Sequence, residues 1–148
     1  MRTANPTTIV ELWRSGKAPA WDGLYRADGS ARSAQVDGDE LSWFELGEPL
    51  DLDALLAASP DHVTQVGAPP DRVAALQDGS GYVGCGEGAL GADGFFARFD
   101  KDHDVVWLVF LSDSNPFEQV SVDGSLATFT NSLGNTLTVD LEDPDFAP

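Results

Sequence analysis

Short runs of β-branched and aromatic residues recur at close intervals through the second half of the chain. Within one of them, Val120 and Val122 alternate with polar neighbours, as in a strand with one solvated face. Asp123-Gly124 follows directly, and Asp-Gly between alternating runs is a strong hairpin signal. The predicted strands cover residues 82–86, 95–100, 105–111, 117–122, 126–131 and 136–141. We expect them to form an antiparallel meander of five to six strands.

The segment from Val105 to Leu111 is apolar at every position. A strand that is apolar on both faces is normally buried on both faces. We therefore expect it to be the central strand, covered by helices on one side and by a second layer on the other.

The first half begins with helical signals. Asn5 is a good N-cap, Pro6 suits the first helical position, and Gly16 suits the C-terminal cap. Between them, three apolar residues fall on one face at helical spacing: Ile9, Leu12 and Trp13. The sequence therefore predicts a helix between Asn5 and Gly16.

The rest of the first half predicts short helices joined by irregular chain. One helix is expected over 51–58, with Asp51 as its cap, and a second over 70–77. Residues 17–38 contain several turn-forming glycines and are expected to be irregular, whereas 39–48 fit neither the helical nor the strand period.

Helices followed by a meander are typical of an α+β fold. We expect residues 1–148 to form a single domain in which a helical and irregular part, 1–80, packs on an antiparallel sheet, 81–141. The acidic tail, 142–148, contains two prolines and is expected to be loosely held.

Charge is the most unusual feature of the composition. The chain has 25 acidic and 8 basic residues, a net charge of −17, of which residues 51–148 carry −14. Such a field repels nucleic acids and anionic membranes, so we expect neither as a partner, and it accelerates encounter with a basic protein. The alternative is that the acidity serves solubility alone.

Other features of the sequence predict a cytoplasmic protein. No apolar segment is long enough to span a bilayer, and the first residues lack the pattern of a secretory signal. Cys85 is the one cysteine, so no intrachain disulfide can form.

Two segments partly match sequence motifs of known ligand-binding sites. Residues 79–84 match the G-x-G-x-x-G string of dinucleotide-binding folds, but they open a predicted strand where that site needs a helix. Residues 100–104 resemble the start of a calcium loop, but Val105 and Leu111 stand where the loop needs Gly and Glu. We expect no metal and no cofactor.

An enzyme that uses Cys85 is one alternative. A nucleophilic thiol needs a base beside it, and the chain offers His62 and His103, although nothing in their spacing brings either to the thiol. We therefore expect no catalytic residue. A small-ligand or housekeeping domain is a further alternative, with a pocket lined by Trp43, Trp107 and Cys85.

The aromatic residues divide into core and surface candidates. Trp13, Trp43 and Trp107 lie in periodic segments and are expected in the core. Trp21 and Tyr25 lie in a predicted loop beside acidic residues, where they would either anchor an interface or fold back over the sheet.

Two asparagine-containing turns are the most specific local strings, 113–117 and 131–135. Asn115 precedes a proline, which fixes the backbone, and the Asn side chain can bond the backbone of its own turn. Because two strands separate the turns, both are expected at the same end of the sheet.

These turns and the apolar strand before them resemble the C-terminal sheet of small uncharacterised bacterial proteins, through residues 107–111, 114–117 and 131–135. Some proteins of that kind are grouped with the immunity proteins of polymorphic-toxin and contact-dependent inhibition systems. The resemblance implies a protein that binds and blocks a toxin, and it carries no active-site residue.

We therefore expect a cytoplasmic protein-binding domain, monomeric or homodimeric, whose partner is a basic protein. Its binding surface is expected to be an acidic face at meander turns and strand edges, built from Asp100, Asp102, Asp104, Asp113, Glu118 and Asp123. Trp21 and Tyr25 are the candidate interface aromatics.

Overall fold

The computed structural model describes residues 5–148, and strands dominate it. Strands make up 45% and helices 12%, in 12 strands, three sheets and 2 short helices. The expected α+β fold, with N-terminal helices packed on a meander of five to six strands, is therefore wrong. None of the helices in this part of the chain is long and apolar enough to cross a membrane.

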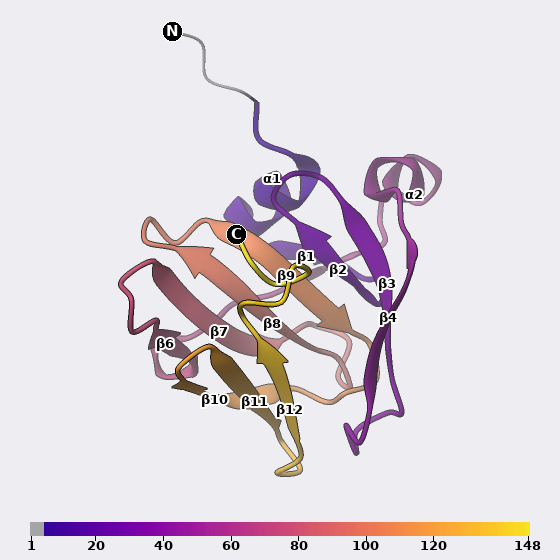
Figure 1. Ribbon diagram of the computed structural model, residues 1–148. Coiled ribbons are helices and arrows are strands. Elements are labelled where there is room, and N and C mark those ends of the chain that lie inside the picture. The colour runs from indigo at the N-terminus through magenta and orange to yellow at the C-terminus, as the bar shows by residue number, and fades with distance from the viewer. Residues whose placement is uncertain (1–4) are drawn as a thin grey trace, which may run out of the picture.

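An antiparallel sheet of seven strands forms the middle layer (Figure 1). From edge to edge, its strands are β4 (Phe44–Pro49), β3 (Ala31–Val36), β2 (Gly23–Arg26), β9 (Val105–Leu111), β8 (Gly94–Asp100), β7 (Gly81–Glu87) and β6 (Val73–Ala75). β9 has three strands on either side, which confirms that the apolar segment is the central strand.

A smaller sheet packs on one face of the large one. Its strands are β10 (Phe117–Asp123), β11 (Leu126–Asn131) and β12 (Thr136–Asp140), in that order. The two sheets enclose an aromatic core in which the ring of Phe96 stacks on that of Phe129, with 4.5 Å between centroids, and meets Trp107 edge to face.

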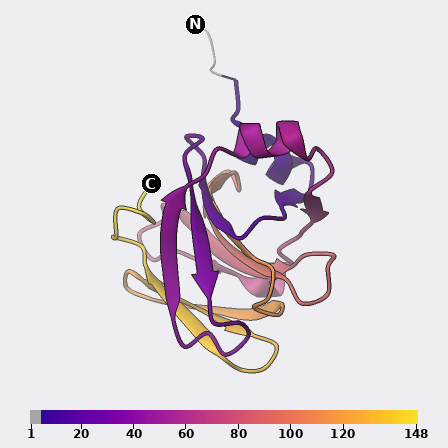
Figure 2. The same cartoon turned by 90° about the vertical axis from the view of Figure 1, so that its right-hand side faces the viewer.

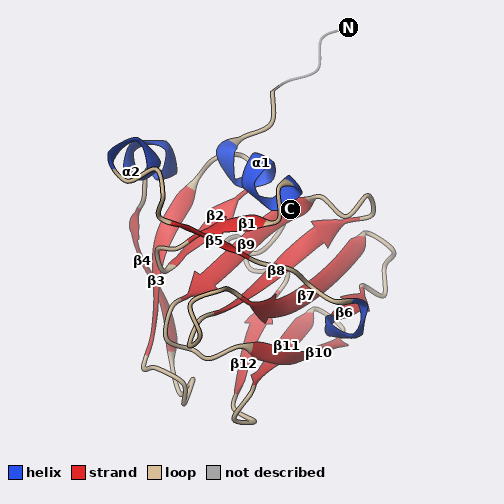
Figure 3. Cartoon of the chain, turned by 180° about the vertical axis from the view of Figure 1, so that it is seen from behind, coloured by secondary structure: helices blue, strands red, loops and turns tan. Residues whose placement is uncertain are grey.

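Helices and a two-stranded sheet cover the opposite face (Figure 3). This layer consists of α1 (Thr8–Arg14), α2 (Leu52–Ala58), β1 (Lys17–Pro19) and β5 (Val63–Gln65). Trp13 on α1 lies against Phe99 of the large sheet, with 4.9 Å between ring centroids. Leu52 on α2 is buried in the same core.

The side chains of β9 alternate between these two cores. Trp107 and Val109 belong to the core between the sheets, and Leu108 and Phe110 belong to the core under the helices. All four are fully buried, which explains why the segment carries no polar residue.

All six segments predicted as strands in the second half are strands. They do not form one meander, because the chain leaves the large sheet after β9 and starts the small sheet with β10. The connection turns at Asn115, whose φ of 63° is a left-handed conformation that asparagine tolerates better than most residues.

The first half supplies strands where irregular chain and a helix were expected. Residues 17–38 contain β1, β2 and β3, and β4 begins inside 39–48. The helix expected over 70–77 is a single 3-10 turn (Pro70–Arg72) followed by β6, because pairing of β6 with β7 overrides the helical spacing.

The other two predicted helices are present. α1 begins at Thr8 with Thr7 as its N-cap, so Asn5 and Pro6 precede it. Asp51 caps α2 as expected, because its carboxylate accepts the N–H of Ala54 at 3.0 Å.

The tail 142–148 is packed, so the expectation that it is loosely held is wrong. Phe146 is only 6% exposed and belongs to the core between the sheets. Its ring centroid lies 5.0 Å from that of Trp107 and 6.4 Å from that of Phe44.

Candidate functional site

Three loops meet at one end of the molecule, as Figure 2 shows for the β3–β4 loop and the β11–β12 turn. Asn131 donates its side-chain N–H to the carbonyl of Asp39 in the β3–β4 loop, at 2.8 Å, and to that of Ser114 after β9, at 2.9 Å. Asn135 donates to the same Asp39 carbonyl at 2.9 Å. The prediction that both asparagine turns lie at the same end is confirmed.

Asn131 also shapes its own turn. Its side-chain oxygen accepts the N–H of Leu133 at 3.1 Å and that of Asn135 at 2.9 Å. The side chain is 2% exposed, so these bonds are shielded from water. The loops at this end are therefore fixed to one another before any partner arrives.

Five acidic residues lie on these loops or directly before β2, and we call them the acidic end: Asp22, Asp37, Asp39, Glu40 and Asp113. Asp22 is tied to the β9–β10 connection through the N–H of Ser112, at 2.9 Å. A side chain at Gly38 would lie 3.8 Å from the carboxylate of Asp113, which places the β3–β4 loop beside that residue. None of the five forms an ion pair within residues 5–148.

Hydrogen bonding keeps part of the acidic end ionised. Ser42 donates its hydroxyl and its N–H to the carboxylate of Asp37. These bonds, that of the hydroxyl first, lower the pKa of Asp37 below its usual value. The β3–β4 loop therefore carries fixed negative charge at neutral pH.

Two large apolar side chains are exposed on the same loops. Trp43 in the β3–β4 loop is 47% exposed, and Leu133 in the β11–β12 turn is 59% exposed. The expectation that Trp43 lies in the core is wrong, because Phe44 and Leu46 are the residues of this segment that pack inward. Tryptophan is enriched at protein interfaces and charged residues gather at their rims, so an exposed Trp43 with acidic residues around it fits an interface with an aromatic centre and a charged rim.

The structure does not gather the six acidic residues that the sequence proposed as one face. Asp100, Asp102 and Asp104 lie on the β8–β9 turn, at the opposite end of β9 from Asp113. A strand of that length spans roughly 20 Å. Glu118 and Asp123 are exposed near opposite ends of β10.

The negative charge of Asp104 is also balanced by an ion pair. Arg14 donates to both of its oxygens, at 2.9 and 2.8 Å, and this pairing lowers the pKa of Asp104. Of the six, only Asp113 belongs to the acidic end. The signal that sequence reasoning missed is the acidic run 37–40, which spans the boundary between the segment expected to be irregular, 17–38, and the segment of ambiguous period, 39–48.

The two candidate interface aromatics are packed in the structure. Tyr25 lies in β2, is 1% exposed and donates its hydroxyl to the carbonyl of Trp21 at 2.6 Å. Burial raises the pKa of Tyr25 above its usual value. Trp21 is half-buried and lies against the ring of His62, with 4.4 Å between centroids.

Cys85 is buried away from either histidine. Its Sγ lies 3.6 Å from the carbonyl of Gln119, and burial raises the thiol pKa to about 12. His62 packs on Trp21, and His103 stacks on Tyr82. No base stands beside the thiol in the described chain, so the arrangement offers no activated nucleophile.

We expect Cys85 to be unreactive in the native protein. A buried thiol with a raised pKa has almost no thiolate at neutral pH. Ellman's reagent at pH 8 should label it only at the rate of unfolding, and completely in denaturant. Fast stoichiometric labelling without denaturant would show that the thiol is accessible.

The pocket residues of the small-ligand alternative do not face a shared cavity. Trp107 and Cys85 are fully buried in the core between the sheets, whereas Trp43 is on the surface. Among residues 5–148, no three or more His, Cys, Asp or Glu side chains are placed to hold a metal ion.

Asp93 is a buried carboxylate in the loop before β8. It is fully buried, and its Oδ1 has no hydrogen-bond partner in the described chain. Burial raises the pKa of Asp93 above its usual value, although backbone N–H groups such as that of Leu90 oppose the shift.

Replacing Asp93 by asparagine is expected to stabilise the protein at pH 7 by about 1 kcal/mol, because a buried charge is removed. In the wild type, folding raises the pKa of Asp93, so the protein keeps its full stability below the unfolded-state pKa of 3.8. Stability is then lost as the pH rises through the folded-state pKa of Asp93. Urea unfolding of both proteins from pH 3 to 7 should therefore show a difference that grows with pH. A constant difference would contradict this role of the charge.

A row of side chains across β2, β9 and β8 holds the tail. Trp107 is the register partner of both Arg98 on β8 and Arg26 on β2, so the three side chains lie side by side on one face. Arg98 Nη1 and Trp107 Nε1 donate to the carbonyl of Phe146, at 3.1 and 2.8 Å. Arg98 is 6% exposed.

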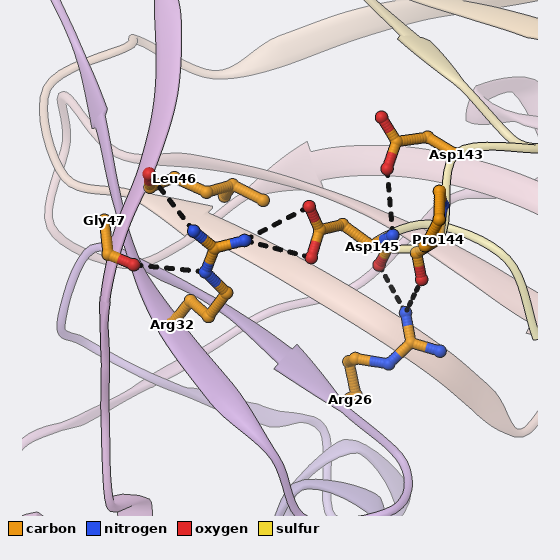
Figure 4. Close-up of polar contacts among 7 residues, drawn as sticks. All are labelled: Arg26, Arg32, Leu46, Gly47, Asp143, Pro144 and Asp145. Carbon is orange, nitrogen blue, oxygen red and sulfur yellow. Dashed lines mark hydrogen bonds and ion pairs between the residues drawn. The ribbon is translucent and has the colours of Figure 1, made fainter.

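Two further arginines, Arg26 and Arg32, contact the tail (Figure 4). Arg26 donates to the carbonyls of Asp145 and Ala147. Arg32 on β3 pairs with both carboxylate oxygens of Asp145, at 3.1 and 3.2 Å. We call Arg26, Arg32, Arg98 and Trp107 the tail clasp.

The chain therefore has two polar clusters: the acidic end, on the loops beyond Leu111, and the tail clasp, which crosses the large sheet at the level of Trp107 to Val109. The resemblance to immunity proteins remains a prediction. Comparison with protein-family models, with curated proteins and with solved structures found no match.

Proposed function

We propose that the protein is a cytoplasmic protein-binding domain that docks its acidic end on a basic surface of a partner protein. The single observation that supports this is the set of five carboxylates that have no ion-pair partner in the described part of the chain, on loops that also expose Trp43 and Leu133. Blocking a toxin of the immunity-system type is the form of binding that we propose, because covering a basic active surface requires no chemistry from this chain.

Electrostatics would set the rate of such binding. A cluster of like charges steers an oppositely charged partner and raises the association rate by 10-fold to 1,000-fold at low salt. Trp43 would then supply apolar contact that slows dissociation, since tryptophan is enriched among residues that dominate binding energy.

Rigidity would add affinity. The asparagine bonds to Asp39 hold the three loops in place, so little conformational entropy is lost when a partner binds. The free, buried Cys85 is compatible with a reducing compartment, which supports the cytoplasmic assignment.

Capture from a lysate of the source cells tests this function. The immobilised full-length chain should retain a basic protein at low salt and release it at about 0.5 M salt, where exposed charges are strongly screened. The purified partner should lose its own activity when one equivalent of the chain is added. If no basic protein is retained at low salt, the proposed binding is contradicted. If the partner stays active in the complex, the proposed inhibition is contradicted.

A further inference from the structure

The tail clasp holds its segment in the way that a protein holds a bound peptide. Residues 142–148 make no backbone-to-backbone hydrogen bond to the described chain beyond Asp140 at the end of β12. Their other backbone bonds lie within the tail, where Phe146 and Ala147 donate N–H groups to the carbonyl of Asp143. The N–H groups of Glu142 and Asp145 are bonded by the carboxylates of Asp140 and Asp143. Side chains of the clasp make the remaining polar contacts.

The clasp contacts two side chains of the segment. One is the aromatic ring of Phe146, which fills a site between Trp107 and Phe44 and is 94% removed from solvent, given its exposure of 6%. The other is the carboxylate of Asp145, the residue directly before Phe146. Both of its oxygens accept hydrogen bonds from Arg32. The remaining contacts reach main-chain carbonyls and do not depend on the side chains of the segment.

Charge supports the same interpretation. Three of the chain's 8 basic residues, Arg26, Arg32 and Arg98, converge on this one segment of a protein with net charge −17. Arg98 is buried without a carboxylate in ion-pair range in the described chain. The tail clasp and the rings beside it are therefore cationic and aromatic, and they complement an acidic segment that carries an aromatic ring.

We propose that the tail clasp is a binding site for a peptide segment of a partner protein that has an acidic residue directly before an aromatic one, and that the chain's own tail occupies it as a tethered competitor. The site shares no residue with the acidic end and does not depend on the function proposed there. A partner segment binds when it displaces residues 142–148 from the clasp.

Peptide binding to full-length variants tests the proposal. The probe is a fluorescein-labelled synthetic peptide with the sequence of residues 140–148. Phe146→Ala and the milder Phe146→Leu weaken the tethered tail, so each should bind the peptide at least tenfold more tightly than the wild type does. The same peptide with alanine in place of phenylalanine, or Arg32→Ala added to either host, should lower binding at least tenfold.

Hydrogen exchange on the unaltered protein gives an independent test. Excess unlabelled peptide should raise deuterium uptake in residues 142–148 to that of free chain, and the alanine peptide should leave it unchanged. The proposal is overturned if folded hosts do not bind the peptide, if both peptides act alike, or if the tail stays protected. It is also overturned if the wild type forms dimers that the peptide dissociates, because the occupant is then a second copy of this chain.

Discussion

Replacing Phe146 by alanine is expected to lower the free energy of unfolding by about 3–5 kcal/mol, the usual range for a buried Phe→Ala change. The ring lies in the core between the two sheets, against Trp107 and Phe44. Its loss leaves a cavity there and weakens the contacts that hold Arg98 in its buried position. Urea unfolding followed by circular dichroism measures the difference.

Leu126→Ala is the matched control, since that side chain is 45% exposed and apolar. Its removal should cost less than about 1 kcal/mol, as most surface substitutions do. If Phe146→Ala were as mild as the control, the tail would be the loosely held segment that its composition suggested, and the tail clasp would contribute little to the fold.

Neutralising the acidic end is expected to slow association with the captured partner by at least about tenfold at low salt, because electrostatic steering accounts for rate enhancements of that size or more. The variant removes four of the five charges, with Asp37→Asn, Asp39→Asn, Glu40→Gln and Asp113→Asn, and it keeps Asp22, whose carboxylate accepts the N–H of Ser112. These changes keep the shape of each side chain, and at Asp37 the amide keeps one acceptor oxygen for the two groups of Ser42 that bond different oxygens of the carboxylate. Stopped-flow or surface-based kinetics at two salt concentrations measure the effect.

The control variant changes the net charge equally at exposed positions away from the acidic end, with Glu48→Gln, Asp71→Asn, Asp102→Asn and Asp123→Asn. Its association rate should stay within about threefold of the wild type, since distant exposed charges are screened. Equal slowing by both variants would show that net charge, and not the acidic end, drives the encounter.

The second half of the fold was predictable because its strands carry strong local signals. Val105–Leu111 is apolar throughout, so its central position follows from burial alone, and Asp123-Gly124 specifies the β10–β11 hairpin. Nothing local shows that the chain changes sheets at Asn115, because that change depends on which surfaces pack together.

The strands of the first half were missed for a physical reason. β3 turns Arg32 toward the tail where a strand usually buries an apolar residue, so its alternation is weak. β6 has only three residues and owes its strand conformation to pairing with β7. Such elements are stabilised by contacts with distant parts of the chain, which the local pattern does not contain.

The candidate site was predictable only in part. The asparagine turns were correctly placed at the same end, since two strands separate them along the chain. The acidic run 37–40 joins them only because β3 and β4 form a hairpin, which the sequence did not indicate. Asp104 looked like a surface charge in sequence, and its pairing with Arg14 is a contact across 90 positions.

Hydrogen exchange of the complex with the captured partner tests the central claim most directly. If the acidic end is the docking surface, amides in 37–43, 112–116 and 132–135 should gain protection together on binding, while those of the β8–β9 turn, 101–104, should not change. Protection confined to that turn, or to the outer face of β10–β12, would contradict the account.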